Sequence, residues 1–417
     1  MKSILRLIKI FSARIILLLS VICLFLQSPL QAQTFTFDGD REKDVMDFQL
    51  IKNLIVIPLY INGKGPYNFV LDTGVSPMII SDPTIIDSLS LGPLRVTKLS
   101  GLGAGNDVEA YLTDQIYVRI GHSTISNIPT AILKEDLFNL SSYLGTRIYG
   151  LIGYYFFNSF VVKIKYPAKR LFFSLPETRV KKKGERIPLE MISNKPYIKA
   201  IVNPAGLEPF EAKLILDIGA SHAISMESYQ DKPFPLPAKT ISANLGVGFT
   251  GLISGHIGRI SSLKIGGTEF DNVLSSFPDY EEAAAKTMLK ERNGNLGSNV
   301  MKHFDITFDY PDFCVYLKPN KYYKRTFEHD MAGMEVYIEE GKPSHYLVGR
   351  IEPGSPAEEA DFHAQDELLS INFKLIHEYS LDDIDLLLKS GNGRRLIIEV
   401  GRGKERLYKL VILRRRV

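Results

Sequence analysis

The feature that most constrains the fold is an internal duplication. The stretches FVLDTGVSPM at residues 69–78 and LILDIGASHA at residues 214–223 share an apolar run, an Asp and a Gly two positions later. A second pair, IGHSTISNIP and IGGTEFDNVL, repeats at the same spacing of 145 residues, and a third pair begins at Gly150 and Gly294. Three matched pairs in one order predict that a single structural unit occurs twice.

Each copy has the pattern of a β domain. NLIVIPLYING at residues 53–63 and KPYIKAIV at residues 195–202 are rich in β-branched and aromatic residues, and Gly-rich turns follow them. The stretch DYEEAAAKTMLKERNG at residues 279–294 favours a helix. We therefore expect two all-β lobes, at residues 33–178 and 179–325, each with one short helix.

The region from residue 331 to residue 417 has a different pattern. Residues 346–372 read as strand, turn, short helix and strand. A helix should follow from Ser380 as N-cap, with Asp383 three residues later and Gly391 as its stop. Two terminal strands complete a small α+β domain, so the fold class expected for the whole chain is mainly β.

The first 32 residues are typical of a secretory signal peptide. Basic residues precede the apolar run Ile15 to Leu26, and the small residue Ala32 lies before a polar start. The alternative is a retained membrane anchor, although the run is shorter than a full span of ~20 residues. We expect an exported protein, periplasmic or secreted, with no integral membrane span after cleavage.

The charge, the cysteines and the histidines argue against a nucleic-acid partner, a disulfide and a metal site in turn. The net charge of +3 is nearly balanced, which argues against a nucleic-acid partner. After cleavage Cys314 is the only cysteine, so no intrachain disulfide can form, and its apolar surroundings DFCVYL indicate a buried structural thiol. The eight histidines show no metal-ligand spacing, and neither a metal nor another cofactor is expected.

Asp72 and Asp217 occupy the same position in the two copies. In a duplicated fold their side chains should meet at a pseudo-twofold axis, and two carboxyl groups held that close share one proton. One of them then acts as general base on a water molecule while the other polarises a carbonyl group. Gly74 and Gly219 permit the sharp turn that directs each carboxyl group to the axis.

Residues 50–320 resemble the bacterial retropepsin-like aspartyl proteases, in a single-chain, two-lobe arrangement like that of pepsins. The matching elements are Asp72-Thr73-Gly74 and Asp217-Ile218-Gly219, with Leu151-Ile152-Gly153 and Asn295-Leu296-Gly297 downstream. The resemblance implies two β-barrel lobes of the acid-protease type, with Asp72 and Asp217 as the catalytic pair. Asn295 departs from the apolar residue of the pattern.

The resemblance also implies a flap that closes over bound peptide, with Gly101, Leu102 and Gly103 at its tip. A plain hairpin tip is the alternative.

The hydroxyl group after each catalytic Asp ties the two lobes together in this family. Thr73 can do this, but Ile218 cannot. A non-catalytic peptide-binding protein with a degenerate cleft is therefore the alternative function, and His222 is interpreted as structural.

Residues 331–417 resemble a PDZ domain of the bacterial protease-associated type. AGMEV at residues 332–336 stands in place of the carboxylate-binding loop, and PGSPAEEADFHAQDELLSIN follows the family's pattern, with Asp361 and Ala364 in place of glycines. The resemblance implies that Gly333, Met334 and Val336 line a groove for an added peptide strand. Alternatively, the domain only packs on the lobes. The expected partners are thus a peptide or protein substrate and a PDZ-bound peptide.

Overall fold

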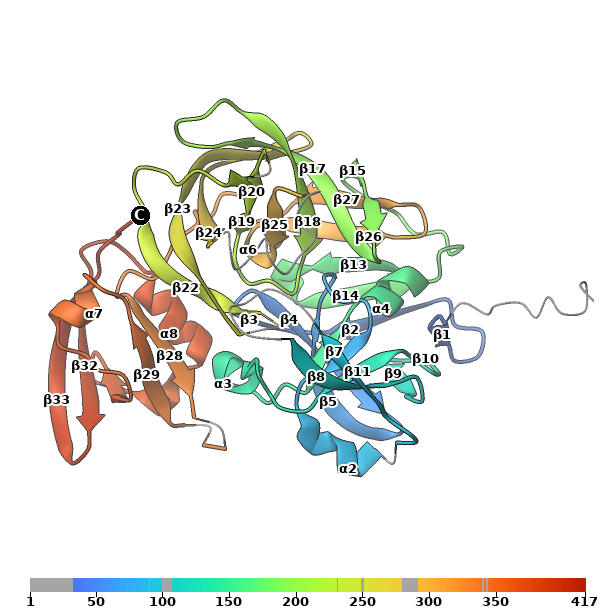
Figure 1. The fold of residues 1–417 in the computed structure, drawn as a ribbon, viewed down its shortest axis with the longest axis horizontal. Helices are drawn as coiled ribbons and strands as arrows, with labels where there is room; N and C mark the ends of the chain where they lie inside the picture. The colour runs from blue at the N-terminus through green and yellow to red at the C-terminus, as the bar shows by residue number, and fades with distance from the viewer. Residues whose placement is uncertain are drawn as a thin grey trace, which may run out of the picture. The chain divides into compact units, whose positions relative to one another are not determined.

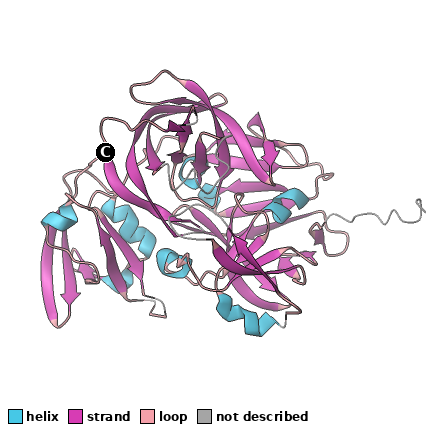
Figure 2. Ribbon diagram, in the orientation of Figure 1, coloured by secondary structure: helices cyan, strands magenta, loops and turns pink. Residues whose placement is uncertain are grey.

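The computed structural model describes residues 33–89, 91–99, 107–230, 232–248, 251–279, 292–339, 341–342 and 344–417. The predicted signal peptide, the flap residues Gly101, Leu102 and Gly103, and most of the predicted helix at residues 279–294 lie outside these ranges. Residues Phe35–Val417 form one compact unit. Strands dominate it (Figure 2), which confirms the mainly β prediction. The predicted boundaries of the three domains stay predictions.

The first copy folds around a sheet to which eleven strands of the described residues belong, in the order β1-β10-β9-β4-β5-β12-β6-β11-β8-β7 with β3 beside β4. These strands are β1 (Thr36–Phe37), β3 (Gln49–Ile51), β4 (Leu54–Ile61), β5 (Lys64–Leu71), β6 (Met78–Ile80), β7 (Arg95–Leu99), β8 (Val108–Thr113), β9 (Val118–Ile120), β10 (Ser123–Ile125), β11 (Thr130–Leu133) and β12 (Gly150–Ile152). The apolar residues of β4 and β5 that the sequence pattern singled out are buried.

The second copy repeats the central part of this arrangement. Its sheet has the order β16-β17-β18-β25-β19-β24-β23-β22 in the described part of the chain, and β17 also pairs with β23. The strands are β16 (Glu190–Ile192), β17 (Lys195–Asn203), β18 (Phe210–Asp217), β19 (Ile224–Met226), β22 (Ile241–Gly248), β23 (Gly251–Ile265), β24 (Thr268–Pro278) and β25 (Gly294–Gly297), with β20 (Ser228–Tyr229) and β21 (Lys232–Pro233) as a separate pair. In both copies the last strand inserts beside the strand that ends at the Asp.

A third sheet takes strands from both copies. Its order is β15-β27-β26-β13-β14-β2 (Figure 1), and β13 of the first copy pairs with β26 of the second at Ile164 and Ile306. The strands are β2 (Lys43–Asp47), β13 (Val161–Lys165), β14 (Arg170–Ser174), β15 (Glu185–Pro188), β26 (Phe304–Asp309) and β27 (Cys314–Pro319). Cys314 is a buried free thiol in β27, as predicted.

The C-terminal region packs around a core of its own. Its sheet has the order β28-β29-β30-β32-β33, with β31 beside β30. The elements are β28 (Met334–Ile338), β29 (Tyr346–Ile351), α7 (Pro356–Glu359), β30 (Glu367–Ile371), β31 (Lys374–Leu375), η4 (Ile376–Glu378), α8 (Leu381–Leu388), β32 (Arg395–Arg402) and β33 (Glu405–Ile412). Helix α8 begins after Ser380 with a capping box to Asp383, which confirms the predicted N-cap.

The helices of the first copy differ from the sequence prediction. One short helix per lobe was expected, but the described part of the first copy has several: η1 (Pro83–Ile85), α2 (Ile86–Leu89), α3 (Leu140–Leu144), α4 (Tyr154–Ser159) and η2 (Tyr166–Ala168). The second copy has α6 (Ser298–Met301). These helices are too short to show a helical period in the sequence, because one turn contributes only one or two apolar positions to a buried face.

Candidate active site

Both predicted aspartates lie at the ends of equivalent strands. β5 ends at Leu71, directly before Asp72, and pairs in parallel with β12, where Leu71 faces Ile152. In the second copy β18 ends at Asp217, which faces Gly297 of β25. The inserted strands β12 and β25 separate β5 from β6 and β18 from β19. The chain must therefore leave the sheet at each Asp, and a tight loop presents the carboxyl group.

The two loops bring both carboxyl groups to one place. The Gly74 N–H donates to Asp72 Oδ1 at 2.6 Å, and the Gly219 N–H donates to Asp217 Oδ1 at 2.9 Å. A Cβ atom at Gly219 would lie 2.1 Å from Asp72 Cγ, and one at Gly74 would lie 3.1 Å from Asp217 Cγ. Each carboxyl group thus packs against the glycine of the opposite lobe. A side chain at Gly219 would clash with Asp72, and one at Gly74 would make a tight contact with Asp217.

The electrostatic environment of Asp72 favours its protonated form. Its side chain is buried. Burial, followed by the charge of Asp217, raises the pKa of the Asp72 carboxyl well above its usual range. A hydrogen bond between the two carboxyl groups acts in the same direction, while the Gly74 N–H and Lys195 oppose the shift. Such a bond requires one carboxyl group to be protonated, as in a pair that shares one proton.

Thr73 makes the cross-lobe bonds that its sequence position predicts. Its hydroxyl group donates to the Leu216 carbonyl oxygen at 2.6 Å and accepts from the Ile218 N–H at 3.0 Å. The side chain of Ile218 is completely buried and offers no hydroxyl group for a reciprocal pair of bonds. One half of the lobe-to-lobe connection is therefore present, and the other half is replaced by apolar packing.

Sequence reasoning missed a polar pair beside Asp217. Asn295 of β25 donates from Nδ2 to Asp217 Oδ2 at 2.8 Å, and its Oδ1 lies 3.2 Å from Nε2 of the half-buried His222. In the first copy the equivalent position is Leu151, which packs against apolar residues. Asn295 departs from the apolar pattern of the repeat, and the structure shows it as a hydrogen-bond donor to Asp217. The sequence feature that could have revealed it is the polar Asn295 at the position where the first copy has the apolar Leu151.

The predicted PDZ loop residues lie at the start of β28. Gly333 has a φ angle of +74°, in the left-handed region that favours glycine, and Met334 and Val336 are buried on the strand that follows. β28 is the edge strand of its sheet. Asp361, in place of a family glycine, also has a positive φ angle of +59°, and its carboxylate is bonded to Lys409 and Arg402. Asp361 therefore adopts the left-handed backbone conformation that glycine favours.

One turn of the first copy contacts both the PDZ helix and the Asp217 loop. The Lys52 N–H donates to Asp382 Oδ1 at 2.9 Å, and Lys52 Nζ lies 3.4 Å from the Val336 carbonyl oxygen. The neighbouring Asn53 donates from Nδ2 to the Ser221 carbonyl oxygen at 3.0 Å, four residues after Asp217. The C-terminal domain thus does pack on a lobe, and the contact includes the strand expected to border the groove.

The described ranges contain neither a metal-binding cluster nor a helix that could span a membrane. In those ranges, no group of three or more histidine, cysteine or acidic side chains is arranged to hold a metal ion. No helix described by the structure combines the length and apolar character needed to cross a membrane.

Two stretches of the chain match known protein families. Residues 57–156 match the family described as aspartyl protease, and residues 347–402 match the family described as PDZ domain. The first match includes Asp72-Thr73-Gly74, and the second begins after the loop that holds Gly333. No curated protein matches the chain. The chain therefore carries a retropepsin-like aspartyl protease domain and a PDZ domain, and both resemblances are confirmed.

Proposed function

Because the chain carries an aspartyl protease domain and a PDZ domain, we propose that it is an aspartic endopeptidase whose PDZ domain engages a substrate or partner. The observation that carries the proposal is the meeting of Asp72 and Asp217. They come from two copies of one fold, and each packs against the opposite glycine. The substrate class is a peptide or an unfolded protein.

The surroundings of the two carboxyl groups support separate roles. Asp217 accepts from the Gly219 N–H and from Asn295, whereas Asp72 accepts from the Gly74 N–H and has the apolar Leu151 at the position equivalent to Asn295. Asp72 holds the shared proton, consistent with its raised pKa. Asp217 then takes a proton from the attacking water as Asp72 protonates the carbonyl oxygen. When the tetrahedral intermediate collapses, its carbon–nitrogen bond breaks, Asp217 gives its proton to the leaving amine, and Asp72 takes back a proton from a hydroxyl group of the intermediate as the carbonyl group forms again.

The test is hydrolysis of a peptide library and an unfolded protein, from acid to neutral pH, with cleavage followed by mass spectrometry. Asp72→Asn and Asp217→Asn should each lose turnover by a factor of at least ~10³, because the water is no longer activated. Asp271→Asn, which removes an exposed carboxylate from β24, is the matched control and should keep full activity. Undiminished cleavage by Asp72→Asn would exclude the mechanism.

A second candidate function is peptide binding without catalysis. Ile218 motivates it, because this residue lacks the hydroxyl group that ties the lobes together in the family. Peptide binding by the wild-type chain, with no turnover at any pH, would favour this alternative. Turnover that disappears in Asp217→Asn would exclude it.

Export is a further part of the proposal. The basic and apolar pattern of residues 1–32 supports a cleaved signal peptide. Amino-terminal sequencing of the protein recovered from the producing cell should find a mature chain that begins near Gln33. A chain that keeps its first residues and sediments with membranes would instead indicate a retained anchor.

A further inference from the structure

The sheet that joins the two copies has one face on which basic residues gather. Directly opposite residues of an antiparallel pair of strands point to the same side of the sheet. On β13, Lys163 lies opposite Phe172 of β14, and Lys165 lies opposite Arg170. The residue between the two lysines, Ile164, is completely buried in the core. The lysines therefore belong to the face of the sheet that the core does not cover.

The same face continues into the second copy. Lys165 lies opposite Asp305 of β26, and Asp305 lies opposite the exposed Lys318 of β27. Beyond β27, the exposed Arg186 of β15 lies opposite Tyr316. Cations thus come from four neighbouring strands that are far apart in the sequence.

The lysines of this face lie close enough to affect one another. Burial, followed by the charge of Lys165, lowers the pKa of Lys163. The charges of Lys183 and Lys318 act in the same direction, whereas Asp305 opposes the shift. We call this surface the basic face, and its cations are Lys163, Lys165, Arg170, Lys183, Arg186 and Lys318.

Few carboxylates of the chain offset these charges. Among the described residues around the basic face, Arg170 pairs with Asp47 at 3.4 Å. The neighbouring Lys182 pairs with Asp309 and with Asp312. The four lysines of the basic face take no part in these ion pairs, so their charges remain available to an anionic partner.

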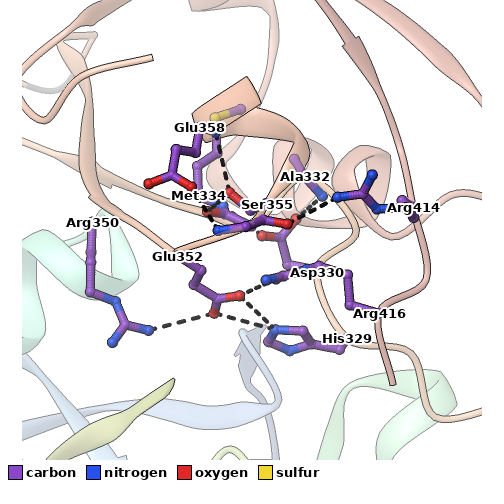
Figure 3. Close-up of polar contacts among 12 residues, drawn as sticks. His329, Asp330, Ala332, Met334, Arg350, Glu352, Ser355, Glu358, Arg414 and Arg416 are labelled. Atoms are coloured by element: carbon purple, nitrogen blue, oxygen red, sulfur yellow. Dashed lines mark hydrogen bonds and ion pairs between the residues drawn. The ribbon is translucent and has the colours of Figure 1, made fainter. Parts of the chain in front are cut away.

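The arginines of the C-terminal domain differ, because they contact carboxylates of the same domain. Arg350 and Arg416 both contact Glu352 (Figure 3), and the side chain of Arg416 is only 7% exposed. Arg414 pairs with Glu359 at 2.8 Å. These charges are held within the domain, whereas the basic face is open to solvent.

Aromatic and aliphatic side chains lie among the cations of the basic face. Lys165 Nζ is 5.2 Å and Arg170 Cζ is 5.7 Å from the centre of the Phe172 ring. Val45 of β2, opposite Phe172, is 40% exposed, and Tyr316 is half-buried. Basic residues mixed with such groups suit the surface of an anionic bilayer, where cations meet lipid phosphates and apolar groups enter the interface.

The charge of the rest of the chain makes this surface exceptional. The formal net charge of the sequence is +3, and the first 32 residues contribute four cations and no anion, so the remaining chain has a net charge of −1. A second copy would present the same cations and be repelled. Lysines supply four of the six cations, whereas the planar guanidinium of arginine is the group best suited to nucleic-acid phosphates.

We propose that the basic face is a docking surface for an anionic lipid membrane. The opposite side of the sheet packs toward the dyad: Phe308 of β26 contacts Phe157 of α4, with ring centroids 4.9 Å apart. Helix α4 begins directly after Gly153, which lies against the Asp72 backbone. A chain docked in this way keeps Asp72 on the side of the sheet away from the lipid. The inference goes beyond the proposed peptidase activity and does not depend on it.

The test measures binding to lipid vesicles by co-sedimentation. Residues Phe35–Val417 form one compact unit, so the chain from Gln33 is used, which removes the apolar run of residues 15–26 as a second membrane contact. Vesicles in which about a third of the lipid is phosphatidylglycerol should bind the chain about tenfold more tightly than vesicles of phosphatidylcholine alone. Added salt should release it, because surface charges are screened. Equal binding to the two kinds of vesicle, or binding to neither, would overturn the inference.

A pair of substitutions tests whether the basic face makes the contact. Lys183→Gln combined with Lys318→Gln removes two exposed cations and should weaken binding to the anionic vesicles by about tenfold, since each lysine near the surface contributes several-fold. Lys232→Gln combined with Lys239→Gln is the matched control, because it changes the net charge equally at exposed positions outside this sheet and should leave binding unchanged. Equal losses in the two variants would contradict the proposal. Binding to a DNA duplex in place of the anionic vesicles would contradict it as well.

Discussion

At the scale of single residues, the two aspartates have different neighbours. Asp217 is bonded to the amide of Asn295, whereas the equivalent position beside Asp72 is the apolar Leu151. His222 fixes the amide from its other side. Hydrogen bonds to an ionised carboxylate stabilise its charge, and an apolar neighbour does not. The two aspartates therefore occupy equivalent backbone positions, but the side chain beside Asp217 is polar and the equivalent one beside Asp72 is apolar.

Replacing Asn295 with leucine tests this asymmetry, because it gives the second lobe the residue of the first. The acidic limb of the pH profile of kcat should move to higher pH by about one unit, since the ionised form of the pair loses a donor. kcat at acidic pH should fall about tenfold while KM changes little. Asn293→Leu is the control, because Asn293 bonds to Lys213 and Ser228 away from the dyad. An unshifted profile would assign Asn295 a purely structural role.

The sequence predicted the two aspartates, but it did not predict that Asn295 donates a hydrogen bond to Asp217. The repeated Asp can be recognised from the sequence alone, because Asp217 follows Asp72 at the same spacing as a second matched pair of segments. The meaning of Asn295 depends on the parallel pairing of β25 with β18, where it faces Ile215 and lies two positions before Gly297. Asn295 can be placed beside Asp217 only when this strand pairing is known.

At the scale of elements, the two Asp loops are joined through one hydroxyl group. Thr73 bonds to the Leu216 carbonyl oxygen and the Ile218 N–H, both in the opposite loop. The family resemblance implied this tie and its missing counterpart, because a hydroxyl residue follows each catalytic Asp in that family and only Thr73 matches it here. The sequence did not predict α2, α3 and α4, which are four to six residues long. The α8 cap was predictable, because Ser380 and Asp383 are local in sequence.

Thr73→Val tests the strength of that connection. The substitution keeps the shape of the side chain but leaves a buried carbonyl oxygen and a buried N–H without a partner. At ~1 to 3 kcal/mol for each of these two groups, the free energy of unfolding should fall by about 2 to 6 kcal/mol in urea titrations. Thr130→Val is the control, because the hydroxyl of the buried Thr130 donates to the nearby Ile128 carbonyl oxygen within the same copy. Equal losses in the two variants would contradict a special role for the cross-lobe bonds.

At the scale of the whole molecule, the shared sheet allows one chain to supply both halves of the site. β13 and β26 pair side by side, so the two copies are joined by a continuous hydrogen-bond ladder. In a symmetric dimer each half would come from a different subunit. The sequence predicted two lobes in one chain from the duplication, but the ladder between them depends on a long-range pairing that no local pattern specifies.

Mixing two inactive variants tests whether one chain is sufficient. Asp72→Asn and Asp217→Asn chains, combined in equal amounts, should remain inactive, because each site draws both carboxyl groups from its own chain. Specific activity of the wild-type chain should also stay constant on dilution from micromolar to nanomolar concentration. Recovery of about a quarter or more of the activity in the mixture would show that sites form between chains.

Carrying both copies on one chain has an evolutionary consequence. In a homodimer every substitution appears twice, so an isoleucine after the Asp would remove both hydroxyl groups, and an asparagine beside it would serve both carboxyl groups. Here the copies have diverged independently: one keeps Thr73 and Leu151, and the other has Ile218 and Asn295. Covalent duplication thus freed each half of the site to specialise without a matching change in the other.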